Sequence, residues 1–181
     1  MTSKDPWNAP YSVKIIHNFL ESKYEKYIYS LIESKKFHVA TQSIGNNKTV
    51  QEEHKIRMDY TLTPSECSII DIPLVMKSES KCHLRERWRI LHYDGTMDKK
   101  SFRGPHTDWS SHSCHRRMSI IIGLSEPSMY TGGELVFKNN NLQYKIERGA
   151  AVVFDSRLVH EVLPVTSGQR YVLQAFVYVV F

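Results

Sequence analysis

Three histidines, an aspartate and a cysteine lie close together in the segment GPHTDWSSHSCH, residues 104–115. All of these side chains are potential metal ligands. His106 and Asp108 form an H-x-D triplet, and His92 and Asp94 form a second one. In a β-strand the first and third residues of such a triplet lie on the same face. Each triplet therefore offers an imidazole and a carboxylate, two of the three ligands of a facial 2-His-1-carboxylate iron site.

The third ligand has its best candidate in His160, which lies among apolar residues in LVHEVLPV. The alternative is a core histidine that hydrogen-bonds a backbone carbonyl. Ser167-Gly168 predicts a turn, and a hairpin there would place Arg170 near His160. Arg170 would then project into the interior together with Gln174, and a guanidinium in that position needs an anion. The alternative for Arg170 is a surface position.

The other potential ligands of the segment allow a zinc site as an alternative. Cys82-His83 would have to pair with Cys114-His115, but structural zinc sites usually contain C-x₂₋₄-C or H-x₃₋₅-H pairs. His112 and His115 are just short of that separation. We favour a polar loop over the mouth of the site. Trp109, beside Asp108, either stacks on a substrate or packs against the protein.

Short runs typical of β-strands dominate the chain from about Arg87 onward. Turn-forming residues such as Asp94-Gly95 and Gly132-Gly133 separate them. About six to eight strands at this spacing predict an antiparallel sandwich or barrel, and the lack of alternating helices argues against a Rossmann or TIM-type fold. The runs are RWRILHY, RRMSIIIGL, ELVF, LQYKI, AAVVF, LVHEVLPV and RYVLQAFVYVVF.

Two helices are expected before the β-rich part. Apolar residues recur at helical spacing within LESKYEKYIYSLIESKKF, residues 20–37. A second helix begins at TPSE, with Thr63 as the N-cap, Pro64 at the first helical position and Glu66 completing a capping box. We expect both helices to pack outside the β core.

The composition fits one globular domain. The chain has 181 residues, of which 41% are hydrophobic, which suffices for one full core. We expect a single domain over residues 1–181, with a helical part to about residue 86 and a β core over about 87–181. The net charge of +5 is a mild basic bias that weakly favours anionic partners, and the alternative, a solvated basic surface, is preferred. No basic run with interleaved aromatic residues supports a nucleic-acid partner.

The cysteines and the N-terminus bear on the cellular compartment. Cys67, Cys82 and Cys114 show no spacing typical of a disulfide framework. The sequence MTSKDPWNAPYSVK lacks the apolar region of a secretory signal, and no apolar run is long enough for a membrane helix. We expect a soluble, cytoplasmic protein without a membrane partner. The sequence does not indicate an oligomeric state.

The order of these parts, HTD…GGELVF…RGAAVVFDSRLVHEVLPVTSGQR, resembles the C-terminal half of prolyl 4-hydroxylase-type Fe(II)/2-oxoglutarate dioxygenases. The resemblance extends over about residues 88–181, and more weakly over residues 13–34. It implies a double-stranded β-helix (jelly roll), iron held by His106, Asp108 and His160, and 2-oxoglutarate and dioxygen as co-substrates. It also implies ascorbate as a reductant.

The resemblance assigns further residues to the co-substrate. Arg170 matches the basic residue that pairs with the distal carboxylate of 2-oxoglutarate, and Tyr93 is similar to a tyrosine that contacts the same group. Where some relatives place a second hydroxyl, this chain has Gly123, so Ser119 or Gln174 is expected to compensate.

The implied activity is hydroxylation of an unactivated C–H bond, with release of succinate and CO₂. The substrate implied is a prolyl residue in a peptide or protein, lying near Trp109. A free amino acid, another small molecule and alkylated nucleic acid remain alternatives within the fold. Dealkylating relatives usually carry a second arginine soon after the first, and none follows Arg170. A cupin-like binding module is the non-enzymatic alternative, although the H-x-H pair typical of cupins is absent.

Overall fold

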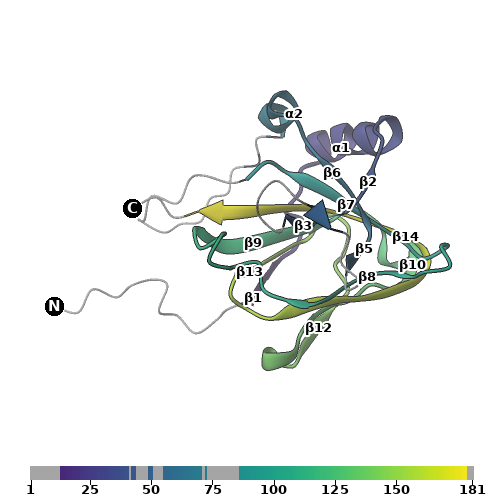
Figure 1. Ribbon diagram of the computed structural model, residues 1–181. Helices are drawn as coiled ribbons and strands as arrows, with labels where there is room; N and C mark the ends of the chain where they lie inside the picture. Colours follow the sequence, from purple (N-terminus) through teal and green to yellow (C-terminus); the bar gives the residue numbers. More distant parts are fainter. Residues whose placement is uncertain are drawn as a thin grey trace.

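The computed structural model describes residues 13–40, 42–43, 49–50, 55–70, 72 and 86–178. These residues form two antiparallel sheets that share one long strand, and both α-helices lie on the same side of them (Figure 1). The elements are β1 (Val13–Ile16), α1 (Ser22–Ser34), β2 (His38–Val39), β5 (Lys55–Ile56), β6 (Met58–Thr61), α2 (Pro64–Ile69), β7 (Arg89–Asp94), β8 (Ser101–His106), β9 (Arg116–Gly123), η1 (Pro127–Met129), β10 (Tyr130–Gly132), β11 (Leu135–Phe137), η2 (Lys138–Asn140), β12 (Leu142–Tyr144), β13 (Ala151–Asp155) and β14 (His160–Tyr178), with β3 (Gln42–Ser43) and β4 (Thr49–Val50) forming a separate pair.

The shared strand β14 defines the architecture. The larger sheet has the strand order β1-β13-β9-β14-β7-β6-β2. In the smaller sheet the first part of β14 pairs with β8 on one side and with β10 and β11 on the other. Strand β5 extends the smaller sheet beyond β8, and β12 extends it beyond β11. The predicted jelly-roll core is confirmed.

The predicted hairpin at Ser167-Gly168 is wrong, because the chain continues through this point as one strand. Gly168 has a φ of +68° and pairs with Tyr130 of β10. A side chain at Gly168 would collide with the carbonyl oxygen of Met129. Both halves of β14 find partner strands, so extending the strand satisfies more backbone groups than turning back would.

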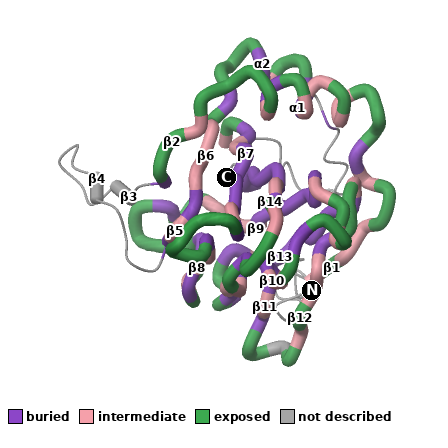
Figure 2. The backbone as a smooth tube through the Cα atoms, turned by 90° about the vertical axis from the view of Figure 1, so that its right-hand side faces the viewer, coloured by how far each residue is buried: buried purple, intermediate pink, exposed green. Residues whose placement is uncertain are grey.

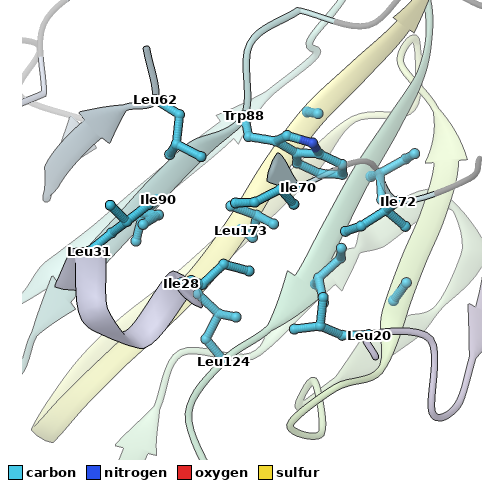
Figure 3. Packing of buried hydrophobic residues seen from close by; sticks show 14 of the residues in the cluster. Leu20, Ile28, Leu31, Leu62, Ile70, Ile72, Trp88, Ile90, Leu124 and Leu173 are labelled. Carbon is cyan, nitrogen blue, oxygen red and sulfur yellow. The ribbon is translucent and has the colours of Figure 1, made fainter. Parts of the chain in front are cut away.

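The larger sheet is buried on both faces, which explains why three consecutive residues of β9, Ile120 to Ile122, are apolar. Alternate residues such as Ile120 and Ile122 pack beneath the helices, whereas Ile121 points between the two sheets. Figure 3 shows the helix-side cluster, in which Ile28 and Leu31 of α1 meet residues of the sheet. Figure 2 shows the buried segments in the middle of the molecule, along strands such as β7, β9 and β14.

The two predicted helices are present. Helix α1 lies within the predicted range, and α2 has the full capping box between Thr63 and Glu66. The prediction of a helical part up to residue 86 is wrong for the described residues, because strands β1, β2, β5 and β6 belong to the two sheets. The two-residue strands are too short to produce a recognisable sequence period.

Strand β8 was not among the predicted strands, although it carries one of the candidate ligands. Its sequence, SFRGPH, contains Gly104 and Pro105, which favour turns and weaken a strand pattern. Tertiary pairing with β5 and β14 nevertheless holds it extended. None of the helices in the described part of the chain has the length and apolar character needed to cross a bilayer.

Candidate active site

The side chains of His106, Asp108 and His160 converge on one point. Nε2 of His106 lies 3.6 Å from Oδ1 of Asp108, and Nε2 of His160 lies 3.5 Å from Oδ2. All three candidate ligand atoms lie within 4.8 Å of one another. Within the described residues this is the one group of three or more His, Cys, Asp or Glu side chains with such geometry. Three ligands on one side of a common point can hold one metal ion and leave its other positions open.

Strand pairing brings the two histidines together. His160, at the start of β14, lies directly opposite His106, at the end of β8, and their ring centroids are 4.2 Å apart. Asp108 lies beyond the end of the strand, and its backbone N–H donates a hydrogen bond to the carbonyl of Ser156 (3.0 Å). The position of His106 in strand β8 therefore sets the direction of its side chain. Asp108 lies outside the strand and is positioned by its backbone hydrogen bond to Ser156.

Backbone carbonyls orient both imidazole rings. Nδ1 of His106 lies 2.9 Å from the carbonyl oxygen of Gly104, and Nδ1 of His160 lies 3.0 Å from that of Leu158. A carbonyl can only accept, so each Nδ1 must carry the proton and donate it. In the neutral ring Nε2 then carries the lone pair, directed at the common point, which is the tautomer that a metal-binding histidine requires.

Ser119 contacts the candidate ligand Asp108. Its hydroxyl donates to Oδ2 of Asp108 at 2.6 Å and also lies 3.0 Å from the hydroxyl of Ser156. Both serines are fully buried. The predicted contact between Ser119 and a co-substrate stays a prediction, whereas the contact seen in the structure is with the carboxylate of the candidate ligand Asp108.

The surroundings favour the ligand forms of two site residues. Burial by itself would raise the pKa of Asp108, but the neighbouring His160 and His106 and the hydrogen bond from Ser119 outweigh it and hold this pKa well below its usual range. For His160, burial lowers the pKa, and the nearby Asp108 opposes this only in part. An ionised carboxylate and a neutral imidazole are the forms that bind metal.

Arg170 is a buried cation that has no counter-ion among the described residues. Its side chain is 1% exposed, and none of its three guanidinium nitrogens has a hydrogen-bond partner among the described residues. It lies opposite Tyr93 in the β14–β7 ladder, with the guanidinium carbon 4.9 Å from the centroid of the Tyr93 ring. A buried, unpaired charge is costly, so the position requires an anionic ligand. A carboxylate matches the planar guanidinium fork.

Gly133 makes room for this arginine. A Cβ atom at Gly133, where φ is +72°, would lie 2.8 Å from Cδ of Arg170. The glycine is therefore required both by its backbone conformation and by the close approach of Arg170. Tyr130 lies nearby, and burial raises the pKa of its phenol while the charge of Arg170 opposes that shift. Its hydroxyl is outside hydrogen-bonding geometry with Arg170.

Arg57 was missed by the sequence reasoning. Its Nη1 donates to the hydroxyl of Tyr93 (3.0 Å), while its Nε donates to Asp59 (2.8 Å). Arg57 is buried. Its two hydrogen bonds link Tyr93, the tyrosine predicted to contact the co-substrate, to the carboxylate of Asp59 on β6. The only signal in the sequence is the alternation of charges in KIRMDY, a pattern that usually marks a solvent-facing strand edge.

Two adjoining pockets meet at the candidate metal site. A wider cleft of about 520 Å³ contains His106 and Asp108, and a narrow one of about 10 Å³ contains His160 and Arg170. Gln174 is buried and lines both, which keeps it a candidate contact. The narrow pocket holds about one water, so a larger ligand enters only if side chains turn aside. Residues lining both pockets are Arg57, Arg103, His106 and Gln174.

The remaining potential ligands lie apart from this point. Trp109 is 40% exposed and does not line either pocket. His112 lines the wider cleft, and Cys114 is an exposed free thiol, but neither joins a metal-binding cluster within the described residues. Cys82 and His83 lie outside the described residues. His92 belongs to the helix side of the sheet, where its ring stacks on Tyr171 at 4.2 Å.

The residues present fit an iron centre with a dicarboxylate co-substrate. The donor set is two imidazoles and one carboxylate, which is the facial set of non-haem Fe(II) oxygenases. The unpaired Arg170 beside that set fits one end of an organic acid whose other end reaches the metal.

Curated relatives match part of the chain. A PKHD-type hydroxylase of Prochlorococcus marinus is 33% identical over 90 residues, which are 46% of this chain and 41% of that protein. A PKHD-type hydroxylase of Maricaulis maris is 36% identical over 77 residues, which are 41% of this chain and 35% of that protein. The chain thus spans well under half the length of these relatives.

Solved structures share the fold over nearly the whole chain. A prolyl-4-hydroxylase of Pseudomonas putida has a TM-score of 0.71 at 17% identity, covering 96% of this chain and 95% of its own. A prolyl hydroxylase of Trichoplax adhaerens, in complex with a peptide fragment of hypoxia inducible factor, has a TM-score of 0.68 at 17% identity, covering 92% of this chain and 83% of its own. At this level of identity the likeness concerns the fold.

The family assignment rests on the β core that carries the site. Residues 88–178 match the family described as the 2OG-Fe(II) oxygenase superfamily, whose reactants are 2-oxoglutarate and dioxygen and whose metal is Fe(II). That range includes the three converging ligands, Arg170 and Tyr93. The chain belongs to the 2OG-Fe(II) oxygenase superfamily.

Proposed function

We propose that this protein hydroxylates a prolyl residue of a peptide or protein, consuming 2-oxoglutarate and dioxygen and releasing succinate and CO₂. His106, Asp108 and His160 hold the iron, and Arg170 pairs with the distal carboxylate of 2-oxoglutarate, with Tyr93 beside it. One oxygen atom enters the substrate C–H bond and the other enters succinate. The bound iron supplies activation of dioxygen, and the protein supplies position and a screened environment.

The observation that carries the oxygenase part is the buried Arg170 beside the three converging ligands. The guanidinium of Arg170 has no hydrogen-bond partner among the described residues, and the narrow pocket connects it with His160. A metal-binding module without a co-substrate would gain nothing from a buried, unpaired cation. This arrangement supports turnover of 2-oxoglutarate over the cupin-like alternative.

The shape of the site supports a peptide substrate. The wider cleft of about 520 Å³ reaches the ligands His106 and Asp108 and is bounded by the polar loop residues Ser110, His112 and Ser113. A cleft bordered by a loop suits an extended chain passing across it. The fold shared with prolyl hydroxylases, one of them with a bound peptide, supports the same substrate class by analogy.

The test is turnover with a defined panel of substrates. The protein is incubated with Fe(II), ascorbate and 2-oxoglutarate, together with proline-containing peptides, free proline or methylated oligonucleotides. We expect succinate release and a gain of one oxygen atom in a peptide, and no product from an Arg170→Ala variant at the same co-substrate concentration. Turnover of free proline or the oligonucleotide with every peptide unchanged would refute the peptide assignment. Metal binding without any succinate release would favour the binding module.

A further inference from the structure

The wider cleft in front of the candidate metal ligands is lined by cations from several strands. Lys55 comes from β5, Arg89 from β7, Arg103 from β8 and Arg116 from β9. Arg57, between β5 and β6, also lines it. Among the described residues, Asp108 is the one carboxylate in this lining, and it faces the candidate metal site.

Nearby carboxylates hold some of these cations without joining the lining of the cleft. Asp59 binds Arg57 at 2.8 Å and lies 4.0 Å from Nζ of Lys55. Glu86 binds Arg116 at 2.6 Å, and the guanidinium of Arg116 also lies 4.0 Å from the Phe176 ring centroid. These contacts fix the cations in place, as a preorganised binding surface requires.

The cations are close enough to repel one another. Burial lowers the pKa of Lys55 to about 8; Arg57, Arg103 and Arg89 add to this shift, and Asp59 opposes it. Burial also lowers the pKa of Arg89; Asp59 and Glu86 oppose this shift, and Arg57 and Arg116 add to it. Crowding like charges in a partly buried cleft is unfavourable, and an anion bound there relieves it.

The co-substrate does not account for this charge. Arg170 lies in the narrow pocket, whereas Lys55, Arg89 and Arg116 line the wider cleft and not the narrow pocket. Arg89 lies directly opposite Gln174 in the β14–β7 ladder, so its side chain is on the cleft side of the strand. The positive charge of the wider cleft is therefore available to bind the other reactant, the substrate that is hydroxylated.

We propose that the wider cleft selects peptides with carboxylate side chains flanking the residue that is hydroxylated. The peptide part of this inference rests on the proposed function, whereas the preference for carboxylates rests on the cleft itself. Glutamate or aspartate next to the target would pair with Arg89 and Lys55 while the target faces His106 and Asp108. Charge-assisted hydrogen bonds to arginine and lysine provide the attraction.

The test uses matched peptides with one proline and flanking Glu, Gln or Lys residues. For the wild-type protein we expect kcat/KM for the Glu peptide to exceed that for the Gln peptide about tenfold or more, with the ratio falling as salt is added. The Arg89→Gln variant should lose most of this preference while its KM for 2-oxoglutarate stays unchanged. Lys26→Gln, which removes an exposed charge on α1, should keep the preference.

Direct binding separates this inference from the proposed reaction. Fluorescence anisotropy of labelled Glu and Gln peptides is measured with the wild type, Arg89→Gln and Lys26→Gln. Suppose that no peptide is hydroxylated but the Glu peptide still binds preferentially through Arg89. The proposed reaction is then wrong, and the inference that the wider cleft binds acidic peptides is supported. Equal affinity for the Glu and Gln peptides overturns the inference, as does a preference that survives in Arg89→Gln. Turnover of free glutamate with every Glu peptide rejected overturns its peptide part.

Discussion

The hydroxyl of Ser119 donates a hydrogen bond of 2.6 Å to Oδ2 of Asp108, inside a fully buried contact that also includes Ser156. Partners of this kind fix a metal-binding carboxylate in one orientation. Ser119→Ala should weaken metal affinity by about 10–100-fold without removing a ligand. The measurement is an anaerobic titration with Fe(II) or Co(II). Ser30→Ala, on the exposed face of α1, is the control, and an unchanged affinity in Ser119→Ala would contradict the assigned role.

Metal binding should stabilise the fold, because the three ligands come together only in the native structure. At a concentration 100 times the dissociation constant, a metal ion adds about 2.7 kcal/mol to the free energy of unfolding. We expect Fe(II) or Co(II) to raise the Tm of the wild type, and we expect no such rise in Asp108→Ala or His160→Ala. A metal-dependent rise in Tm that persists in both variants would place the ion elsewhere.

Replacing Arg170 should have opposite effects on the ligand-free and the ligand-bound protein. Arg170→Met exchanges a buried, unpaired guanidinium for an apolar side chain, so the ligand-free protein should be at least as stable as the wild type. Its affinity for 2-oxoglutarate should fall by about 2–5 kcal/mol, roughly thirtyfold or more. Thermal unfolding and calorimetric titration measure the two effects. A strongly destabilised variant would instead indicate an internal partner for Arg170.

Arg57 and Tyr93 should act together on 2-oxoglutarate binding. Tyr93→Phe removes the hydroxyl that accepts from Arg57, and Arg57→Lys removes the fork that joins this hydroxyl to Asp59. We expect each variant to weaken binding and the double variant to show a coupling of about 0.5–3 kcal/mol. Strictly additive losses would mean that Arg57 does not position Tyr93.

Glu66 should contribute to stability in a pH-dependent way. Burial by itself would raise its pKa, but hydrogen bonds from Lys35, Thr63 and Tyr60 outweigh it and lower the pKa from 4.5 to about 2. The stabilisation is therefore present above about pH 4.5 and is lost as the pH falls toward 2. The Tm of Glu66→Gln should lie below that of the wild type at pH 7, with the gap closing over this window. A constant gap from pH 7 to pH 2 would exclude this linkage.

Local patterns predicted some elements well. Helix α2 was predicted from four residues, because the capping box of Thr63 and Glu66 satisfies backbone groups within a single turn. The strands that lie between two layers, such as β9, were predicted because burial on both faces leaves an apolar run. Strand β8 was missed because its extended conformation depends on partner strands rather than on SFRGPH.

The sequence by itself determined which side chains are available for chemistry and in what order they occur. His106, Asp108, His160 and Arg170 were singled out because a 2-His-1-carboxylate set and an interior cation imply a metal and an anion. The tertiary structure decided how they meet: the register of β8 and β14 opposes the two histidines, and the register of β14 and β7 opposes Arg170 and Tyr93. Register between strands distant in the chain depends on the packing of all layers at once, so no local pattern encodes it.

The same reason explains the contacts that sequence reasoning missed. Ser119 and Arg57 are ordinary polar residues in the chain, and nothing in their neighbours indicates a role. Ser119 meets Asp108 only because β9 lies beside the segment after β8 that carries Asp108. Arg57 meets Tyr93 only because the chain between β5 and β6 lies beside β7. A hydrogen bond between distant segments is a property of their position in space, which only the folded structure specifies.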